Sequence, residues 1–221
     1  FPTRRSSDLD LAKDAYHFLE GAIEAVMEPV EESIKAYRSY SGAVGKLTTA
    51  LKLQGEFTDE AVDHYKELAE ELEHTTKLSE DQTLKMAALG KQIRLPTAQI
   101  DKMIKTAAGL AEVMGVDVES AFQAQLQTLK GNARAVATYD VRLKNLTEAQ
   151  LRQGKGLDLL AEKFTGFGEA AAKSYGGTLI QIHNITEKIF RQIGEFFFRA
   201  FDLKGQALFK KEVLEQVLHF V

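Results

Sequence analysis

The sequence contains no cysteine and no tryptophan, and only 3 prolines among 221 residues. Without cysteine the chain can form no disulfide, no thiolate metal site and no cysteine nucleophile. The scarcity of proline, together with many Ala, Leu, Glu, Lys and Gln residues, favours helix along the whole chain. The sequence also lacks an uncharged apolar run of about 18 residues or more, so it predicts no transmembrane span.

Charge is spread unevenly, although the net charge is only −4. Residues 10–81 contain 17 acidic and 7 basic side chains, whereas residues 82–221 contain 14 acidic and 19 basic ones. A basic surface can attract nucleic acid or an acidic protein. Here the basic residues are interspersed with acidic ones, which is typical of solvated helix faces, and we predict no specific nucleic-acid binding.

The first nine residues, FPTRRSSDL, have the character of a foreign segment. They include the adjacent Arg4 and Arg5, but no apolar stretch follows them, so they do not match a secretory signal. When one suitable codon is chosen for each of the nine residues, the resulting DNA sequence is the end of a common short-read sequencing adapter. We therefore expect residues 1–9 to be an artefact without a binding role, and the chain to be a fragment of a longer gene product.

Further along the chain, apolar residues recur at steps of three and four, which predicts helices. Residues 10–54 carry one narrow stripe that suits a long coiled-coil-like helix. Capping residues and glycines then mark the expected starts and stops of shorter helices. The expected starts are at Thr58, Ser79, Thr97, Asp117 and Thr147, and the expected stops at Gly55, Gly115 and Gly131.

The predicted fold is all-α, because no segment shows the alternating pattern of a strand. We expect an elongated coiled-coil-like segment, a bundle of shorter helices and a long amphipathic aromatic helix. The expected divisions are 1–9 for the artefact, 10–54 for the long helix, 55–165 for the bundle, and 166–221 for a glycine-rich start and the amphipathic region. Glycines on either side are expected to limit one helix to Leu157–Phe164.

The sequence predicts no catalytic residue, no cofactor site and no metal site. The stretch GFGEAA at 166–171 has the spacing of a dinucleotide-binding turn, but that turn needs a preceding strand and a helical stretch precedes it here. The five histidines are not spaced as metal ligands. Four acidic residues follow helical spacing and predict a solvated face: Glu67, Glu70, Glu71 and Glu73. We therefore do not expect an enzyme.

An aromatic stretch, IFRQIGEFFFRAF at 189–201, is the strongest candidate for an interaction face. Charged residues at Arg191, Glu195 and Arg199 make it unsuitable for crossing a bilayer. Two interpretations are open, namely burial between neighbouring helices, and an amphipathic segment that meets a membrane or a protein groove. The residues predicted to share the face are Ile189, Phe190, Ile193, Phe197 and Phe201, and Phe196 and Phe198 broaden it.

Several stretches together resemble a known family. They are ALGKQIRLPTAQIDKMIKTAAGLAEVMGVDVESAFQAQLQTLKGNARAV at 88–136, YDVRLKNLTEAQ at 139–150, and GFGEAAAKSYGGTLIQIHNITEKIFRQIGEFF at 166–197. Over residues 47–197 the chain resembles the amino-terminal region of tail tape measure proteins of long-tailed bacteriophages and prophages. The spacing of GTLIQIHN to IGEFF is the most specific feature, while SYGGT departs from the family's Thr-x-x-Gly form.

The resemblance implies structural work rather than catalysis. Tape measure proteins lie in the lumen of the growing tail tube, where their length sets tube length, and the resemblance also implies a role in DNA delivery. The implied partners are further copies through helix association, the tail tube, assembly chaperone and tail-tip proteins, and a membrane during infection. The implied location is the virion tail, and the host cytoplasm during assembly. The alternative is a bacterial helical coiled-coil interaction protein or membrane-active effector.

Overall fold

The computed structural model describes the backbone of residues 4–201, and the side chains of residues 28–199 except Tyr175. Every element in the described part is helical, which confirms the all-α prediction for these residues. The chain divides into two units. We call residues 39–185 the bundle unit, and residues 1–38 together with 186–221 the terminal unit. Helices α1 (Arg4–Gln54) and α8 (Tyr175–Phe201) contribute to both units.

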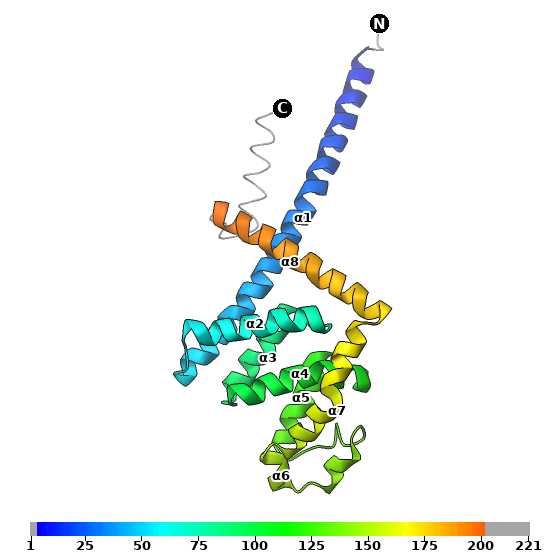
Figure 1. Ribbon diagram of the computed structural model, residues 1–221. Helices are drawn as coiled ribbons and strands as arrows, with labels where there is room; N and C mark the ends of the chain where they lie inside the picture. The colour runs from blue at the N-terminus through cyan, green and yellow to red at the C-terminus, as the bar shows by residue number, and fades with distance from the viewer. Residues whose placement is uncertain (1–3, 202–221) are drawn as a thin grey trace. The chain divides into compact units, whose positions relative to one another are not determined.

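The bundle unit holds the remaining helices, whose order is followed by colour in Figure 1. Most of them are joined by short turns, as expected for neighbouring helices of a compact unit, and a longer segment, residues 130–140, connects α5 to η1. In chain order they are α2 (Asp59–Thr75), α3 (Glu80–Gln92), α4 (Thr97–Met114), α5 (Val118–Leu129), the 3-10 helix η1 (Val141–Asn145), α6 (Glu148–Arg152) and α7 (Lys155–Ala172).

Most predicted helix boundaries in the bundle unit are confirmed. Four of the five residues at predicted starts accept a hydrogen bond from a backbone N–H of the first turn, which satisfies a donor that the helix itself leaves free. The fifth, Thr97, is the first residue of α4 and makes no such bond, because the N-cap position is taken by Pro96. At the other ends, Gly55 and Gly115 adopt left-handed backbone angles, φ +72° and +67°, that favour glycine. The N-caps with this bond are Thr58, Ser79, Asp117 and Thr147, and Ser79 and Thr147 form complete capping boxes.

Helix α4 lies at the centre of the bundle unit, where it packs against α3, α5 and α7. The apolar stripes of α2, α4 and α5 all point into this core. Burial of these side chains is the main favourable contribution to folding. The buried residues of the three stripes are Val62, Tyr65, Leu68 and Leu72, then Ile100, Ile104, Ala107 and Ala111, then Val118, Ala121, Phe122 and Leu126.

Two details of the bundle unit correct the sequence prediction. Helix α7 does not stop at Phe164 but continues to Ala172 through Gly166 and Gly168. Glycine costs a helix only about 1 kcal/mol relative to alanine, so packing against α4 can retain it. The second detail concerns Glu73, which was expected on a solvated face and is buried instead. Glu73 directly follows Leu72, which is buried on the core side of α2. Its position along the helix therefore turns its side chain toward the core.

Helix α1 runs without a break through Pro29, and ends at Gln54 as predicted. Ser33 lies one turn after the proline, and its hydroxyl donates a hydrogen bond to the carbonyl oxygen of Pro29 over 2.6 Å. The helix begins at Arg4, within the segment that the sequence marks as an adapter, and that interpretation stays a prediction. Of the predicted stripe, Ile34, Leu47 and Leu51 are buried.

Candidate interaction surface on helix α8

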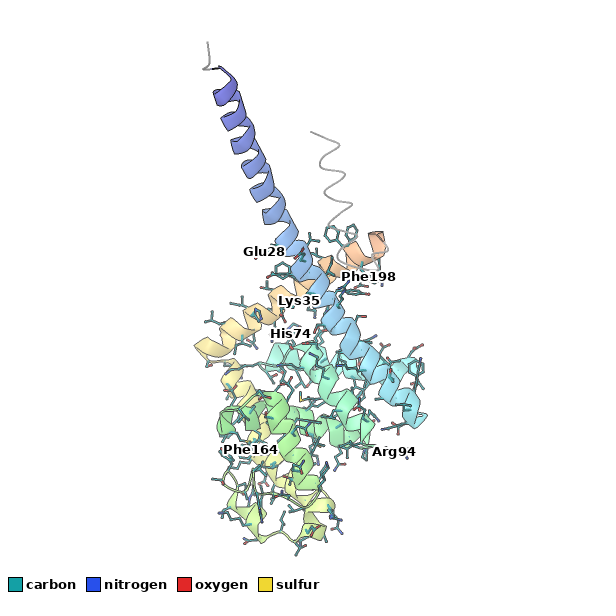
Figure 2. All side chains as sticks on the ribbon, turned by 180° about the vertical axis from the view of Figure 1, so that it is seen from behind. Glu28, Lys35, His74, Arg94, Phe164 and Phe198 are labelled. Carbon is teal, nitrogen blue, oxygen red and sulfur yellow. The ribbon has the colours of Figure 1, made fainter. Side chains whose placement is uncertain are left out.

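In the terminal unit, α8 crosses α1 with the two backbones in direct contact. A Cβ atom built on Gly194 would lie 1.9 Å from the carbonyl oxygen of Ser33, so only glycine fits at this point. Beside the crossing, the rings of Tyr37 and Phe198 pack with their centroids 5.3 Å apart. Phe198 is labelled in Figure 2. This contact fixes which side of α8 is turned toward α1.

The predicted interaction face is divided by this crossing. Ile189 and Ile193 are exposed, at 51 % and 40 %. Phe190 and Phe197 are half-buried. The side chain of Phe201 lies outside the described residues. The structure therefore places two of the predicted residues on an open surface and two at its border.

Phe196 joins Ile189 and Ile193 on the open side of α8 and is 66 % exposed. Residues at steps of three and four share one helix face, and Gly194 lies on the opposite side. We call Ile189, Ile193 and Phe196 the outer strip. The outer strip lies nearer to the solvent side of α8 than the predicted face does. The sequence alone did not show which side of α8 would pack against α1.

The first part of α8 belongs to the bundle unit and is held there by amide side chains. The Gln181 Nε2 donates to the carbonyl oxygen of His74 over 3.1 Å, and Asn184 Nδ2 donates to that of Leu78 over 3.2 Å. These bonds satisfy carbonyl groups at and after the end of α2. Apolar residues on the same stretch are exposed: Leu179, Ile180, Ile182 and Ile185.

A spacing signal in the sequence could have located the outer strip. Ile182 and Ile193 are eleven positions apart, as are Ile185 and Phe196. Eleven residues are close to three full helical turns, so such a repeat keeps its members on one side of a nearly straight helix. The predicted face instead included Phe197 and Phe201, which are four positions apart. Because four residues are slightly more than one helical turn, side chains repeated at this spacing move gradually around the helix.

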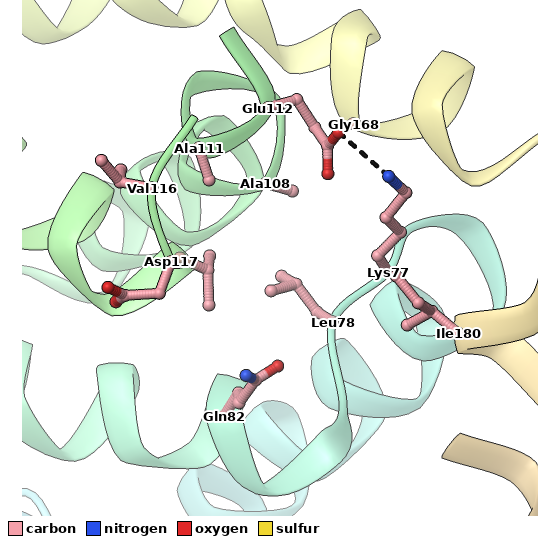
Figure 3. A pocket seen from close by; sticks show the side chains of 11 residues that line it. Lys77, Leu78, Gln82, Ala108, Ala111, Glu112, Val116, Asp117, Gly168 and Ile180 are labelled. Carbon is pink, nitrogen blue, oxygen red and sulfur yellow. Dashed lines mark hydrogen bonds and ion pairs between the residues drawn. The ribbon is translucent and has the colours of Figure 1, made fainter. Parts of the chain in front are cut away.

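The bundle unit has a separate pocket of about 200 Å³ (Figure 3). Its apolar wall includes Ala108 and Ala111 of α4 and Gly168 of α7, whose small side chains leave the space open. At its edge the Lys77 ammonium lies 3.0 Å from the Glu112 carboxylate. The pocket is large enough for one apolar side chain, and nothing in its lining indicates a reaction.

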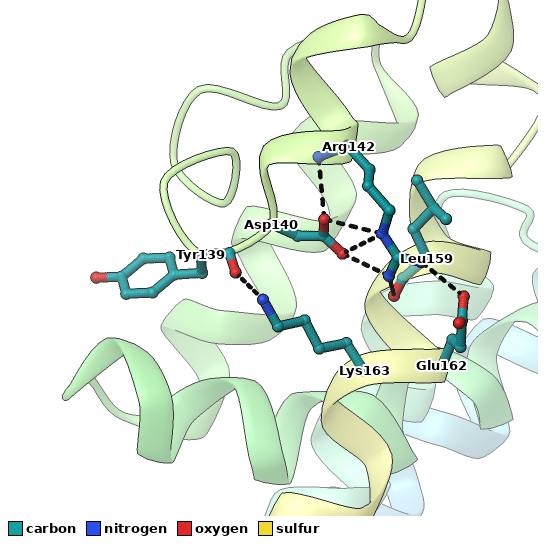
Figure 4. Close-up of polar contacts among 6 residues, drawn as sticks. All are labelled: Tyr139, Asp140, Arg142, Leu159, Glu162 and Lys163. Atoms are coloured by element: carbon teal, nitrogen blue, oxygen red, sulfur yellow. Dashed lines mark hydrogen bonds and ion pairs between the residues drawn. The ribbon is translucent and has the colours of Figure 1, made fainter.

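A separate cluster of polar residues joins η1, and the residues just before it, to helix α7 (Figure 4). The Arg142 guanidinium donates to both carboxylate oxygens of Asp140, with its Nη2 2.7 Å from Oδ2, and its Nη1 donates to Glu162 over 3.0 Å. Hydrogen bonds from Arg142 lower the pKa of the buried Asp140. Lys163 donates to the backbone carbonyl of Tyr139. The groups are mutually satisfied, which indicates a structural clamp.

The most deeply buried charge in the bundle unit is the ammonium of Lys91, whose side chain is 2 % exposed. Its Nζ lies 2.5 Å from Glu56 and 2.9 Å from the hydroxyl of Thr97. These contacts join the turn after α1 to the end of α3 and the start of α4. Nearby, burial raises the pKa of Tyr65 to about 12, with the charges of Asp101 and Glu56 adding to the effect.

Searches for metal and membrane features in the described residues give two findings. No group of three or more His, Asp or Glu side chains there could hold a metal ion. No helix in that part of the chain combines the length and apolarity needed to cross a membrane.

No protein-family model, curated protein or solved structure matches the chain. The resemblance to tape measure proteins accordingly depends on the sequence motifs quoted above.

Proposed function

We propose that the chain is part of a structural and assembly protein of a phage tail, of the tape measure type. The observation that carries the proposal is the placement of glycines in residues 166–197, the segment with the most specific resemblance. Gly168 faces α4, Gly177 faces the end of α7, and Gly194 faces α1. At each of them an added Cβ would come within 3.0 Å of another part of the chain.

These glycines support a scaffolding role for the segment. The fingerprint of a dinucleotide site uses glycine so that a backbone can approach a phosphate group. Here Gly168 and Gly194 lie inside continuous helices and allow other helices to approach. The segment then presents the outer strip of α8, an apolar surface suited to helices of a further copy or of tail tube, chaperone and tail-tip proteins.

The proposal is tested by changing the length of the intact gene in a phage or prophage that carries it. In-frame deletions should shorten the tail by about 1.5 Å for each residue removed, the rise of an α-helix. Tail lengths are measured by electron microscopy. A matched control replaces Gly166 by alanine, which keeps the residue number and should keep tail length. Tails of unchanged length in a graded deletion series would exclude the ruler role.

A membrane-active bacterial effector is the second candidate, and the exposed apolar strip of α8 favours it. An amphipathic helix of this kind can lie in a membrane interface without spanning it. Flotation of the purified chain with vesicles of phosphatidylethanolamine and phosphatidylglycerol tests this candidate. Binding that is lost when Ile193 and Phe196 are replaced by serine would support it, and absence of binding would exclude it.

A further inference from the structure

Five exposed apolar side chains form one row along α8. The row consists of the outer strip and two isoleucines that precede it, and each of the five side chains is at least 40 % exposed. Because α8 is one unbroken helix of 3.6 residues per turn, all five lie within about 40° of Ile189 around the helix axis. A row of this kind marks a contact surface. We call it the α8 row, and its members are Ile182, Ile185, Ile189, Ile193 and Phe196.

The spacing of the α8 row is the same in both directions from its centre. Ile185 and Ile182 lie four and seven positions before Ile189, and Ile193 and Phe196 lie four and seven positions after it. When two identical helices pack antiparallel about a two-fold axis, each position before the centre meets the equivalent position after it in the other copy. The row is therefore complementary to a second copy of itself.

We propose that two copies of the chain pair through α8, antiparallel, about a two-fold axis at Ile189. In this pair Ile189 meets Ile189 of the second copy, Ile185 meets Ile193, and Ile182 meets Phe196. The inference goes beyond the proposed function, since it concerns the assembly of the chain itself and holds whether or not the chain is part of a phage tail.

The two sides of the α8 row differ, and this difference favours the antiparallel direction. In an antiparallel pair each side meets the same side of the second copy, so the rings of Phe190 and Phe197 face an apolar surface. A parallel pair would bring these rings against polar and charged groups, whose desolvation is unfavourable. The first side holds Leu179, His183, Thr186, Phe190 and Phe197, and the second holds Gln181, Lys188, Gln192, Glu195 and Arg199.

The side of α8 opposite the row is occupied within the chain. In the terminal unit, Gly194 and Phe198 pack against α1. In the bundle unit, Asn184 donates to the carbonyl oxygen of Leu78, and Ile180 lines the pocket of Figure 3. The α8 row is thus the side of the helix that a second copy can reach without displacing these contacts.

The area of the row is sufficient for a weak dimer. About half of each member is exposed, and a side chain of this size has an area of about 200 Å². The five side chains would bury about 500 Å² on each copy, or about 1,000 Å² in all, which is the lower limit of a specific interface. We therefore expect a dissociation constant in the micromolar range.

Analytical ultracentrifugation of the full chain tests the pairing. Between about 1 and 200 μM the chain should pass from monomer to dimer. Ile189→Asp should weaken the dimer by at least about a hundredfold, because two carboxylates would meet at the axis within an apolar contact. Leu53→Asp is the matched control: it makes the same kind of change at a leucine of α1 that is 76 % exposed, and should leave the dimer intact. Circular dichroism establishes that both variants retain their helices.

Cysteine cross-linking tests the direction, because the sequence has no cysteine of its own. On oxidation Ile189→Cys should form a disulfide between two copies. Ile182→Cys should not, since the two thiols would be about 21 Å apart along the antiparallel pair. A mixture of Ile182→Cys and Phe196→Cys chains should cross-link with each other, because these positions meet across the axis.

Three results would overturn the inference. A chain that stays monomeric up to about 200 μM has no pairing of the expected strength. If Ile182→Cys cross-links as readily as Ile189→Cys, the two copies are parallel or associate without a fixed register. If the chain stays monomeric but floats with vesicles of phosphatidylethanolamine and phosphatidylglycerol, the α8 row is a membrane surface. The tail-length series is independent of all three results, so the two proposals can fail separately.

Discussion

Gly109 of α4 lies against the backbone of Phe164 of α7, so that a Cβ atom on Gly109 would be 1.8 Å from the Phe164 carbonyl oxygen. On the facing helix, a Cβ on Gly168 would lie 2.8 Å from the Cβ of Ala108. The two helices thus approach as closely as their backbones allow. Since α4 is the central helix of the bundle unit, this contact positions much of its core.

Replacing Gly109 by alanine should therefore destabilise the bundle unit. The new methyl group can be accommodated only if α4 and α7 move apart, and overpacking of this kind costs about 1–3 kcal/mol. The free energy of unfolding, measured by urea denaturation, should fall by about this amount. Unchanged stability of Gly109→Ala would mean that the two backbones are not in contact.

Gly166→Ala is the matched control for the same helix pair. Gly166 lies within α7, and a Cβ built on it meets no atom within 4 Å. Alanine is the better helix former there, so this variant should gain about 0.5–1 kcal/mol of stability. The opposite signs of the two alanine variants separate helix packing from helix propensity.

The ion pair between Lys91 and Glu56 should respond unequally to loss of either partner. Lys91 is 2 % exposed whereas Glu56 is 53 % exposed. Glu56→Gln leaves a buried ammonium without its counter-charge and should cost about 1–3 kcal/mol. Lys91→Met replaces that ammonium by an apolar side chain of similar length, and the freed Glu56 can be solvated, so its cost should be smaller. Urea denaturation of both variants decides the order, and a larger loss for Lys91→Met would contradict it.

Asp140 should make the bundle unit sensitive to acid. Hydrogen bonds from Arg142 lower the pKa of Asp140 in the folded chain, so its contribution to stability is complete above the pKa of the unfolded chain, about 4. That contribution is lost as pH falls below this value through the folded pKa. Asp140→Asn should lower stability at neutral pH by about 1–3 kcal/mol and weaken the acid dependence.

Unfolding curves at several pH values between neutral pH and about pH 3 measure both effects. Asp158→Asn is the control, since Asp158 is paired with Lys102 but its side chain is 62 % exposed. An exposed pair contributes about 0–1 kcal/mol, so this variant should follow the natural chain closely. Parallel pH dependence of Asp140→Asn and the natural chain would remove Asp140 from the explanation.

The local signals of the sequence were sufficient for the ends of most helices. Thr58 and the Ser79–Gln82 box act through neighbouring backbone groups, so their effect does not require knowledge of the rest of the fold. The glycines of α7 show the limit of such signals. Glycine usually weakens a helix, but Gly168 stays inside α7 because it packs against α4, which is distant in sequence.

The same limit explains the shift of the candidate surface. Periodicity showed that α8 is amphipathic, but its apolar residues extend over more than one side of the helix. Only the crossing with α1 shows that Phe198 is turned toward Tyr37 and that Phe196 is left outside. The signal for that crossing was Gly194, a residue that sequence reasoning treated as part of a motif and not as a contact.

The crossing itself is tested by Gly194→Ala. A Cβ at this position would lie 1.9 Å from the Ser33 carbonyl oxygen, so α8 and α1 must separate within the terminal unit, at a cost of about 1–3 kcal/mol. Amide hydrogen exchange in residues 28–38 and 190–199 should therefore become faster by about one to two orders of magnitude. Gly176→Ala is the control, because a Cβ there meets no atom within 4 Å, and it should leave exchange in these residues unchanged. Equal exchange in the two variants would mean that α8 is not held against α1 at Gly194, and that the outer strip is not defined by this contact.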